Sequence, residues 1–157
     1  MRLRFAISYV AAFAACFFVP SVAGAQSDDN GDPKADADVE YVRAVQNDDH
    51  QWTFFVTVGH PDTGWEDYAD GWDVLLPDGS VLKPAGSNDR FTRVLLHPHV
   101  NEQPFTRSQR GLRIPDDVPR VVVRAHDIVD GWGGATVEVD LTAENGNRFE
   151  VQRSAAP

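Results

Sequence analysis

From residue 39 onward, apolar and polar side chains alternate along the chain with a period of two. The clearest runs are WTFFVTVG (52–59) and TVEVDLT (136–142). Successive side chains of a β-strand point to opposite faces of a sheet, so such runs are typical of strands with one buried face. No segment between them has the 3.6-residue period of an amphipathic helix. The chain is therefore expected to fold as an all-β protein.

Turn-forming clusters separate these runs and set the number of strands. Asn, Asp, Gly and Pro gather, for example, in PDGS (77–80) and ENGN (144–147), as they do in tight turns. The predicted strands are 39–46, 51–60, 71–76, a short 80–83, 91–97, 110–114, 120–127, 135–142 and an optional 148–152. Seven or eight short strands predict an immunoglobulin-like antiparallel β-sandwich, with a small β-barrel as the alternative.

The first 25 residues have the composition of a secretory signal peptide. MRLR is basic, the stretch 5–19 is small and apolar, and Ala23-Gly24-Ala25 forms an A-x-A cleavage motif before Gln26. The apolar stretch is shorter than the roughly 20 residues that span a bilayer, and no later window is apolar enough to cross one. The protein is therefore expected to be exported, to the periplasm or the medium, without a membrane span.

Two segments flank the cleavage motif, a candidate lipidation site before it and an acidic stretch after it. FAAC (13–16) loosely resembles a lipoprotein box, so lipidation at Cys16 is the alternative to cleavage before Gln26. Residues 26–38 are polar and acidic, without aromatic or branched apolar side chains, and are expected to form a disordered tether. Residues 39–153 then form a single domain, of a length that can bury its own core, and a monomer is the default expectation.

The charge balance and the cysteine content exclude several classes of function. The chain has 14 basic and 24 acidic residues, a formal net charge of −10. Nucleic acid and anionic membrane surfaces require a basic footprint, so neither is an expected partner. Cys16 is the only cysteine and is expected to leave with the signal peptide. Disulfides, thiolate nucleophiles and thiolate metal ligands are therefore not expected.

Histidines at strand ends are the main candidates for a functional site. Four of the five lie beside turns or tryptophans: His60, His97, His99 and His126. If 80–83 is only the extension of a turn, the connections after 51–60, 91–97 and 120–127 emerge at one end of the sandwich. If 80–83 is a full strand, the direction of later strands reverses and the histidines separate.

Three interpretations of these histidines remain open. They could bind a divalent ion, for which nitrogen and oxygen ligands favour copper(II) or zinc. They could instead hold the loops together by donating hydrogen bonds to a carboxylate such as Asp62 or Asp127. In the third interpretation, neighbouring aromatic residues bind an organic ligand or a protein; the candidates are Trp65, Tyr68, Phe105 and Trp132.

Enzymatic activity has little support in the sequence. There is no G-x-S-x-G elbow, no H-E-x-x-H helix motif, no phosphate loop and no dinucleotide fingerprint. Trp72, at the start of a predicted strand, is expected to be a core residue and not a ligand contact. We therefore predict a non-catalytic binding or accessory domain for an unidentified protein or small ligand, with a copper(II)- or zinc-binding protein as the alternative.

Three segments resemble a family of small exported bacterial proteins with immunoglobulin-like folds and no assigned activity: HPDTGWEDYADGW (60–72), HPHVNEQPFTRS (97–108) and RAHDIVDGWGG (124–134). The resemblance covers approximately residues 62–141. It implies export and the sandwich fold, and no particular reaction.

The segment 56–79 is also similar to the iron-site segment of superoxide reductase domains, which carry a His-Pro and then a His-Tyr before a Trp. His60-Pro61 matches the first element, but Asp67 stands at the position of the second histidine. The cysteine ligand of those enzymes is also missing after cleavage. Superoxide reduction is therefore not expected.

Overall fold

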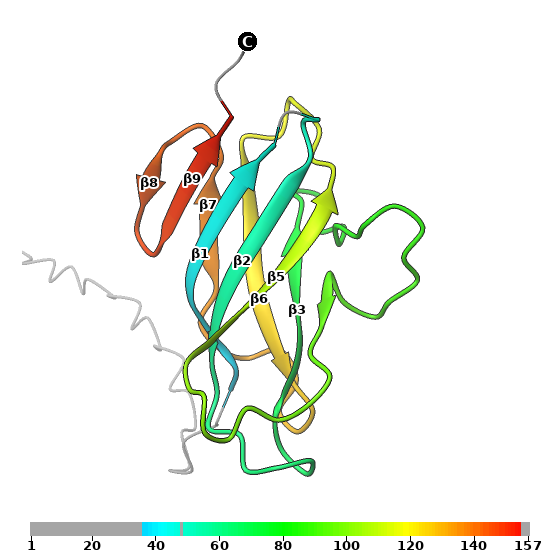
Figure 1. Cartoon of the computed structure of the whole chain (residues 1–157), viewed down its shortest axis with the longest axis vertical. Helices are drawn as coiled ribbons and strands as arrows, with labels where there is room; N and C mark the ends of the chain where they lie inside the picture. The colour runs from blue at the N-terminus through cyan, green and yellow to red at the C-terminus, as the bar shows by residue number, and fades with distance from the viewer. Residues whose placement is uncertain (1–35, 48, 155–157) are drawn as a thin grey trace, which may run out of the picture. The chain divides into compact units, whose positions relative to one another are not determined.

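A computed structural model describes residues 36–47 and 49–154, and this part consists of β-strands and loops without a helix (Figure 1). The strands are β1 (Asp38–Gln46), β2 (Trp52–Gly59), β3 (Ala69–Leu75), β4 (Arg93–Val94), β5 (Phe105–Leu112), β6 (Arg120–Asp127), β7 (Val137–Asp140), β8 (Asn145–Gly146) and β9 (Phe149–Arg153). The predicted signal peptide, its predicted cleavage site and most of the predicted tether lie outside the described residues.

The strand pairing has the connectivity of an immunoglobulin-like sandwich. One sheet has the order β5-β2-β1-β9-β8 and the other the order β4-β3-β6-β7. β2 pairs antiparallel with β5, and β3 pairs antiparallel with β6, so the chain crosses repeatedly from one sheet to the other. β9 joins parallel to β1. The predicted sandwich is confirmed, and the two separate sheets exclude the closed barrel.

The alternating residues of the sequence form the core between the two sheets. Along β2, the side chains of Trp52, Phe54, Val56 and Val58 are buried, and the residues between them are partly exposed. From the opposite sheet, Trp72 is fully buried, as expected for a core tryptophan. No helix in the described part of the chain is long and apolar enough to cross a membrane.

Two predicted strands are shorter in the structure. The segment 80–83 makes only a single bridge, between Leu75 and Val81, so it is the extension of a turn. The segment 91–97 contains only the two-residue strand β4. The reason lies at Thr92, whose amide donates to Asp73 Oδ1 at 3.0 Å and whose hydroxyl donates to the Leu82 carbonyl at 2.6 Å. These two hydrogen bonds from Thr92 take the place of the backbone hydrogen bonds that would extend the strand.

One predicted strand begins five residues earlier than expected. β5 covers Phe105–Leu112 instead of 110–114 because its only buried residues are at its two ends, which hides the period of two. The residues between these two ends make polar contacts, including a 2.8 Å hydrogen bond between the hydroxyls of Thr57 and Thr106. A bulge near its end contains Gly111 with φ 77°. The remaining predicted strands agree within two residues at each end.

Three connections lie at the same end of the sandwich, the lower end in Figure 1: β2–β3 (60–68), β4–β5 (95–104) and β6–β7 (128–136). We call these three connections together the loop pole. Their common location follows because β2, β4 and β6 all run toward this end. The expectation that depended on 80–83 not being a full strand is therefore met.

Candidate functional site

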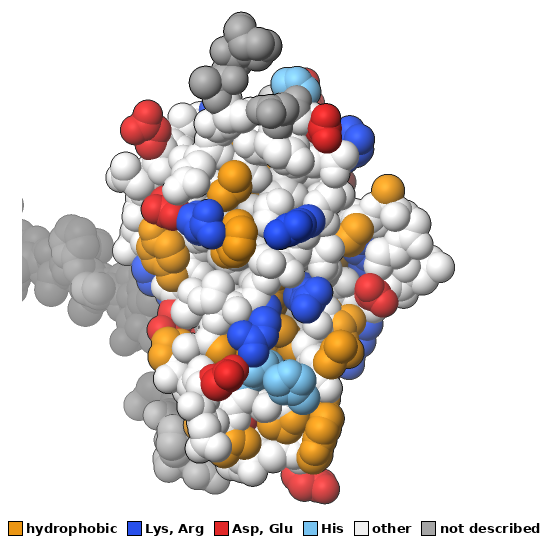
Figure 2. Space-filling view, in the orientation of Figure 1, with side chains coloured by type: hydrophobic (Ala, Val, Ile, Leu, Met, Phe, Trp, Pro, Cys, Tyr) orange, Lys and Arg blue, Asp and Glu red, His pale blue; other side chains and the backbone are white. Residues whose placement is uncertain are grey.

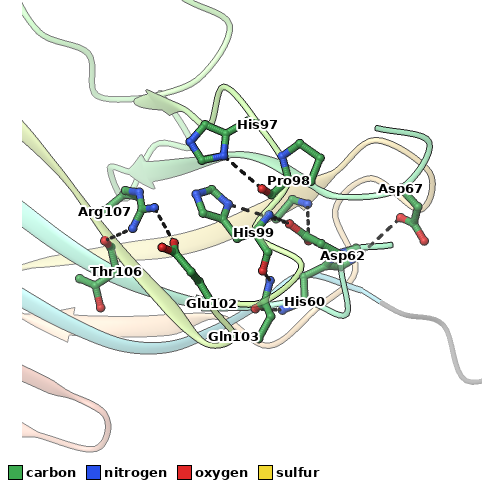
Figure 3. Close-up of polar contacts among 11 residues, drawn as sticks. His60, Asp62, Asp67, His97, Pro98, His99, Glu102, Gln103, Thr106 and Arg107 are labelled. Carbon is green, nitrogen blue, oxygen red and sulfur yellow. Dashed lines mark hydrogen bonds and ion pairs between the residues drawn. The ribbon is translucent and has the colours of Figure 1, made fainter. Parts of the chain in front are cut away.

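Asp62 is a buried hydrogen-bond centre between two connections of the loop pole. Its Oδ1 accepts hydrogen bonds from His60 Nδ1 at 2.6 Å and from the Ala69 amide at 3.1 Å. Its Oδ2 accepts a bond from the His99 amide at 2.6 Å (Figure 3). Gln103 adds a second link, because its Oε1 accepts a bond from the His60 amide at 3.0 Å. These contacts fix the β2–β3 and β4–β5 connections against each other.

His60 has one ring nitrogen left for a ligand. Because Nδ1 is bonded to the Asp62 carboxylate, the neutral ring carries its proton on Nδ1 and its lone pair on Nε2. The side chain is fully buried, and no described residue forms a hydrogen bond with Nε2. Asp67 Oδ1 lies 3.6 Å from Nε2, beyond hydrogen-bond distance. This nitrogen can therefore serve as a metal ligand.

Asp127 brings a buried carboxylate to the same place from the end of β6. It continues the core-facing positions of that strand, so its side chain enters from the core side. Oδ1 accepts hydrogen bonds from the amides of Val129 and Asp130, at 2.9 and 2.5 Å, and so fixes the turn after the strand. Oδ2 is buried and has no hydrogen-bond partner within residues 36–47 and 49–154.

Three potential ligand atoms converge at this point. One atom each from His60, Asp67 and Asp127 lies within 4.8 Å of the others. His60 and Asp127 are buried, and the Asp67 side chain is 29% exposed, which opens the group to solvent on one side. One imidazole and two carboxylates can bind a divalent cation.

His99 is a buried imidazole in the β4–β5 connection. It stacks on Phe105 with ring centroids 3.7 Å apart, and neither ring nitrogen has a hydrogen-bond partner among the described residues. Burial lowers the pKa of His99 below its usual 6.5, and the neighbouring Arg107 and His97 lower the pKa further. His97 lies beside it, with ring centroids 4.5 Å apart, but His97 is exposed.

His126 lies on the outer face of its sheet, away from the other three histidines. Adjacent residues of a strand face opposite sides, so its side chain points away from that of Asp127. Its Nδ1 bonds to Asp70 Oδ1 at 2.5 Å, and its Nε2 accepts a bond from Arg90 at 3.1 Å. The Trp132 ring meets the imidazole edge-on at 4.7 Å. Both ring nitrogens are thus bonded to protein groups.

The four aromatic candidates occupy different environments. Trp65 is 66% exposed and packs edge-on against Tyr68, with ring centroids 5.8 Å apart. Trp132 is partly exposed, with the Arg124 guanidinium 3.7 Å from its ring centre. Phe105 is buried beneath His99. Three of the four therefore reach the surface of the loop pole.

The metal-ligand candidates of the sequence and those of the structure overlap only at His60. His99 is connected to His60 through Asp62, His97 is exposed, and the nitrogens of His126 are occupied. The structure adds Asp67 and Asp127, neither of which was predicted to be a metal ligand. One signal could have identified Asp127, namely a carboxylate that continues the apolar, core-facing positions of a strand.

The chain is similar to a known protein over part of its length. A protein of Halomicrobium mukohataei with the name "Putative lipoprotein" is 38% identical over 104 residues, which make up 66% of this chain and 46% of that protein. The chain thus spans about half the length of the relative it matches. No protein-family model matches the chain. No solved structure matches it either.

Proposed function

We propose that this chain is an exported, non-catalytic domain that recognises a basic protein partner through its loop pole. The location of its exposed apolar side chains carries the proposal. Among the described residues, six of the seven exposed large hydrophobic side chains belong to the loop pole: Trp65, Leu96, Val100, Ile128, Val129 and Trp132. The seventh, Tyr41, lies on β1. Single exposed apolar residues are ordinary, but their concentration on one surface is typical of protein-interaction sites.

Figure 2 supports this location, with hydrophobic side chains gathered beside histidines at the lower end of the molecule. Of the aromatic residues predicted to bind a ligand, we assign direct contact with the partner to Trp65, Tyr68 and Trp132. Phe105 is assigned a supporting role, because it is buried and holds His99 from below. Large aromatic side chains at the centre of an interface often contribute most of its binding energy.

The charge of the loop pole defines the chemistry of the partner. Its three connections contain no Lys or Arg. They contain five acidic residues: Asp62, Glu66, Asp67, Glu102 and Asp130. Asp62 is buried and Glu102 is paired with Arg107 at 3.0 Å, which leaves Glu66, Asp67 and Asp130 in the same loops as the exposed apolar side chains. A surface that is both apolar and acidic is complementary to a partner that is apolar and basic. Nucleic acid and anionic lipid would be repelled.

The buried contacts beneath this surface favour binding without a large ordering cost. Asp62 and Gln103 connect the first two loops. The third is attached through the Ile128 amide, which donates to the Tyr68 carbonyl at 3.2 Å. Loops that are already fixed lose little conformational entropy on association, which strengthens binding.

Export is supported by the signal-peptide composition of residues 1–25 and by the name of the Halomicrobium protein. Cleavage before Gln26 would release the domain into the periplasm or the medium. Lipidation at Cys16, which that name favours, would instead hold it at the membrane surface. The recognition function of the loop pole is the same in both cases.

Site-specific photo-crosslinking in the producing cells tests the proposal. A photoreactive phenylalanine analogue is placed at position 65, at 129 and, as the matched control, at 41, where an exposed aromatic residue lies outside the loop pole. We expect one protein adduct of the same mass at 65 and 129, absent at 41 and diminished by high salt. Adducts of equal yield at all three positions, or none at 65 and 129, would overturn the proposal.

A further inference from the structure

We propose that a divalent metal ion, most suitably zinc, binds beneath the surface of the loop pole, with His60 Nε2 and the carboxylates of Asp67 and Asp127 as ligands. This site differs from the four-histidine site considered from the sequence and goes beyond partner recognition. It joins the β2–β3 connection to the end of β6, two parts of the chain about 60 residues apart in sequence.

The spacing of the three groups suits a single ion. Ligands about 2.1 Å from a tetrahedral ion are about 3.4 Å from each other. His60 Nε2 and Asp67 Oδ1 are 3.6 Å apart, and all three ligand atoms lie within 4.8 Å of one another. The proposed site therefore requires the carboxylates of Asp67 and Asp127 to shift toward the ion.

Two of these atoms are buried polar groups that have no other partner in the described part of the chain. His60 Nε2 and Asp127 Oδ2 are both enclosed by protein and form no hydrogen bond. Buried polar atoms without a partner are unfavourable, and so are two carboxylates brought together without a compensating charge. A divalent cation resolves both problems at once.

The surroundings of His60 have the arrangement that protein metal sites use behind a ligating histidine. Asp62 Oδ1 accepts a hydrogen bond from His60 Nδ1 at 2.6 Å, which leaves the lone pair of the neutral ring on Nε2 and fixes the orientation of the ring. Asp62 is itself held by the amides of Ala69 and His99. The imidazole is therefore oriented before any ion arrives.

The ligand set selects the class of ion. One imidazole nitrogen and two carboxylate oxygens, with no sulfur, suit zinc, whereas calcium takes six to eight oxygen ligands. Three protein ligands also leave one position of a tetrahedral ion for water. The partly exposed side chain of Asp67 provides the route by which the ion enters.

Calorimetric titration of the purified, chelator-stripped protein with zinc chloride tests the site. We expect one zinc ion per chain, and binding at least about tenfold weaker in Asp127→Asn and in Asp67→Asn. Asparagine at 127 keeps an oxygen for the amides of Val129 and Asp130, so the turn is preserved. A thermal scan in chelator establishes that each variant is folded.

Two matched controls make the result specific. Asp130→Asn removes a charge from the same loop, and His97→Gln removes an exposed histidine of the same pole. Both are expected to bind zinc like the unmodified protein. Absence of saturable zinc binding, equal loss in Asp130→Asn, or loss in His97→Gln but not in Asp127→Asn would each overturn the assignment.

Nitrogen NMR of the His60 ring separates the metal from a proton as the occupant of Nε2. We expect the Nε2 resonance of the stripped protein to move, on addition of one equivalent of zinc, to the position of a metal-bound nitrogen. A protonated Nε2 that zinc does not displace would show that an imidazolium between the two carboxylates is the stable state, and would overturn the proposal.

Discussion

The buried carboxylate of Asp62 accepts three hydrogen bonds and so fixes the first two connections of the loop pole. It closes the β2–β3 connection, attaches the β4–β5 connection and orients His60. Neighbouring imidazole and backbone groups donate to it, so both of its oxygens are needed as acceptors.

Asp62→Asn is expected to destabilise the protein by about 2–3 kcal/mol, because the new amide nitrogen faces groups that also donate. Urea unfolding followed by tryptophan fluorescence measures the change. Asp117→Asn, at an exposed position, serves as the control and should leave the stability unchanged within about 0.5 kcal/mol. Equal effects of the two substitutions would show that Asp62 does not brace the loops.

His99 makes the stability of the fold depend on pH. Its pKa is lowered in the folded protein, chiefly by burial, so the unfolded chain takes up a proton at a higher pH than the folded one. The stabilisation from the neutral ring is fully present above pH 6.5. It is lost as the pH falls from 6.5 through the lower pKa of the folded state.

His99→Leu removes this contribution. In the presence of chelator, the free energy of unfolding of this variant should decline less between about pH 7.5 and pH 5 than that of the unmodified protein. His97→Gln alters an exposed histidine of the same loop and is expected to keep most of the pH dependence. Parallel pH profiles for His99→Leu and the unmodified protein would contradict the prediction.

At the scale of the strands, the sequence predicts best those elements whose burial follows a simple alternation. β6 was predicted with its observed bounds, since four of its alternate positions enter the core. β5 was misplaced because only Phe105 and Leu112 are buried and a bulge at Gly111 interrupts its register. The pairing partner of β5 is set by contacts with β2, which lies about 50 residues earlier in the chain and leaves no local pattern.

Gly111→Ala tests the bulge that shifts this strand. Gly111 has φ 77°, and a Cβ there would meet only ordinary contact with Gln51, so the cost arises from the backbone conformation. We expect a loss of about 1–2 kcal/mol in the free energy of unfolding. Gly111→Asn should cost less, because asparagine tolerates this conformation better than alanine. Equal stability of all three proteins would show that the bulge does not require positive φ.

The candidate site also depends on contacts between distant parts of the chain, which leave no local pattern in the sequence. Sequence spacing brought His60, His97, His99 and His126 to one end of the molecule, which is correct for their connections. The spacing did not reveal which ring nitrogens of these histidines form hydrogen bonds with other protein groups. The pairing of His126 with Asp70 depends on the register between β6 and β3, and the approach of Asp127 to His60 depends on packing between sheets.

At the scale of the whole domain, the two proposals describe layers of one structure. The exposed apolar side chains form its outer layer, and the buried group of His60, Asp67 and Asp127 lies beneath them. An ion at the inner layer links the loops that carry Trp65 and Val129. Zinc is therefore expected to raise the melting temperature of the protein, since a ligand that binds only the folded state stabilises it.

The position of the ion is the most direct test of this account. Crystals of the zinc-loaded protein, measured on both sides of the zinc absorption edge, should show one anomalous peak about 2.0–2.2 Å from His60 Nε2 and from a carboxylate oxygen each of Asp67 and Asp127. A peak at His97 and His99 instead, or no peak at the loop pole at full zinc loading, would contradict the account.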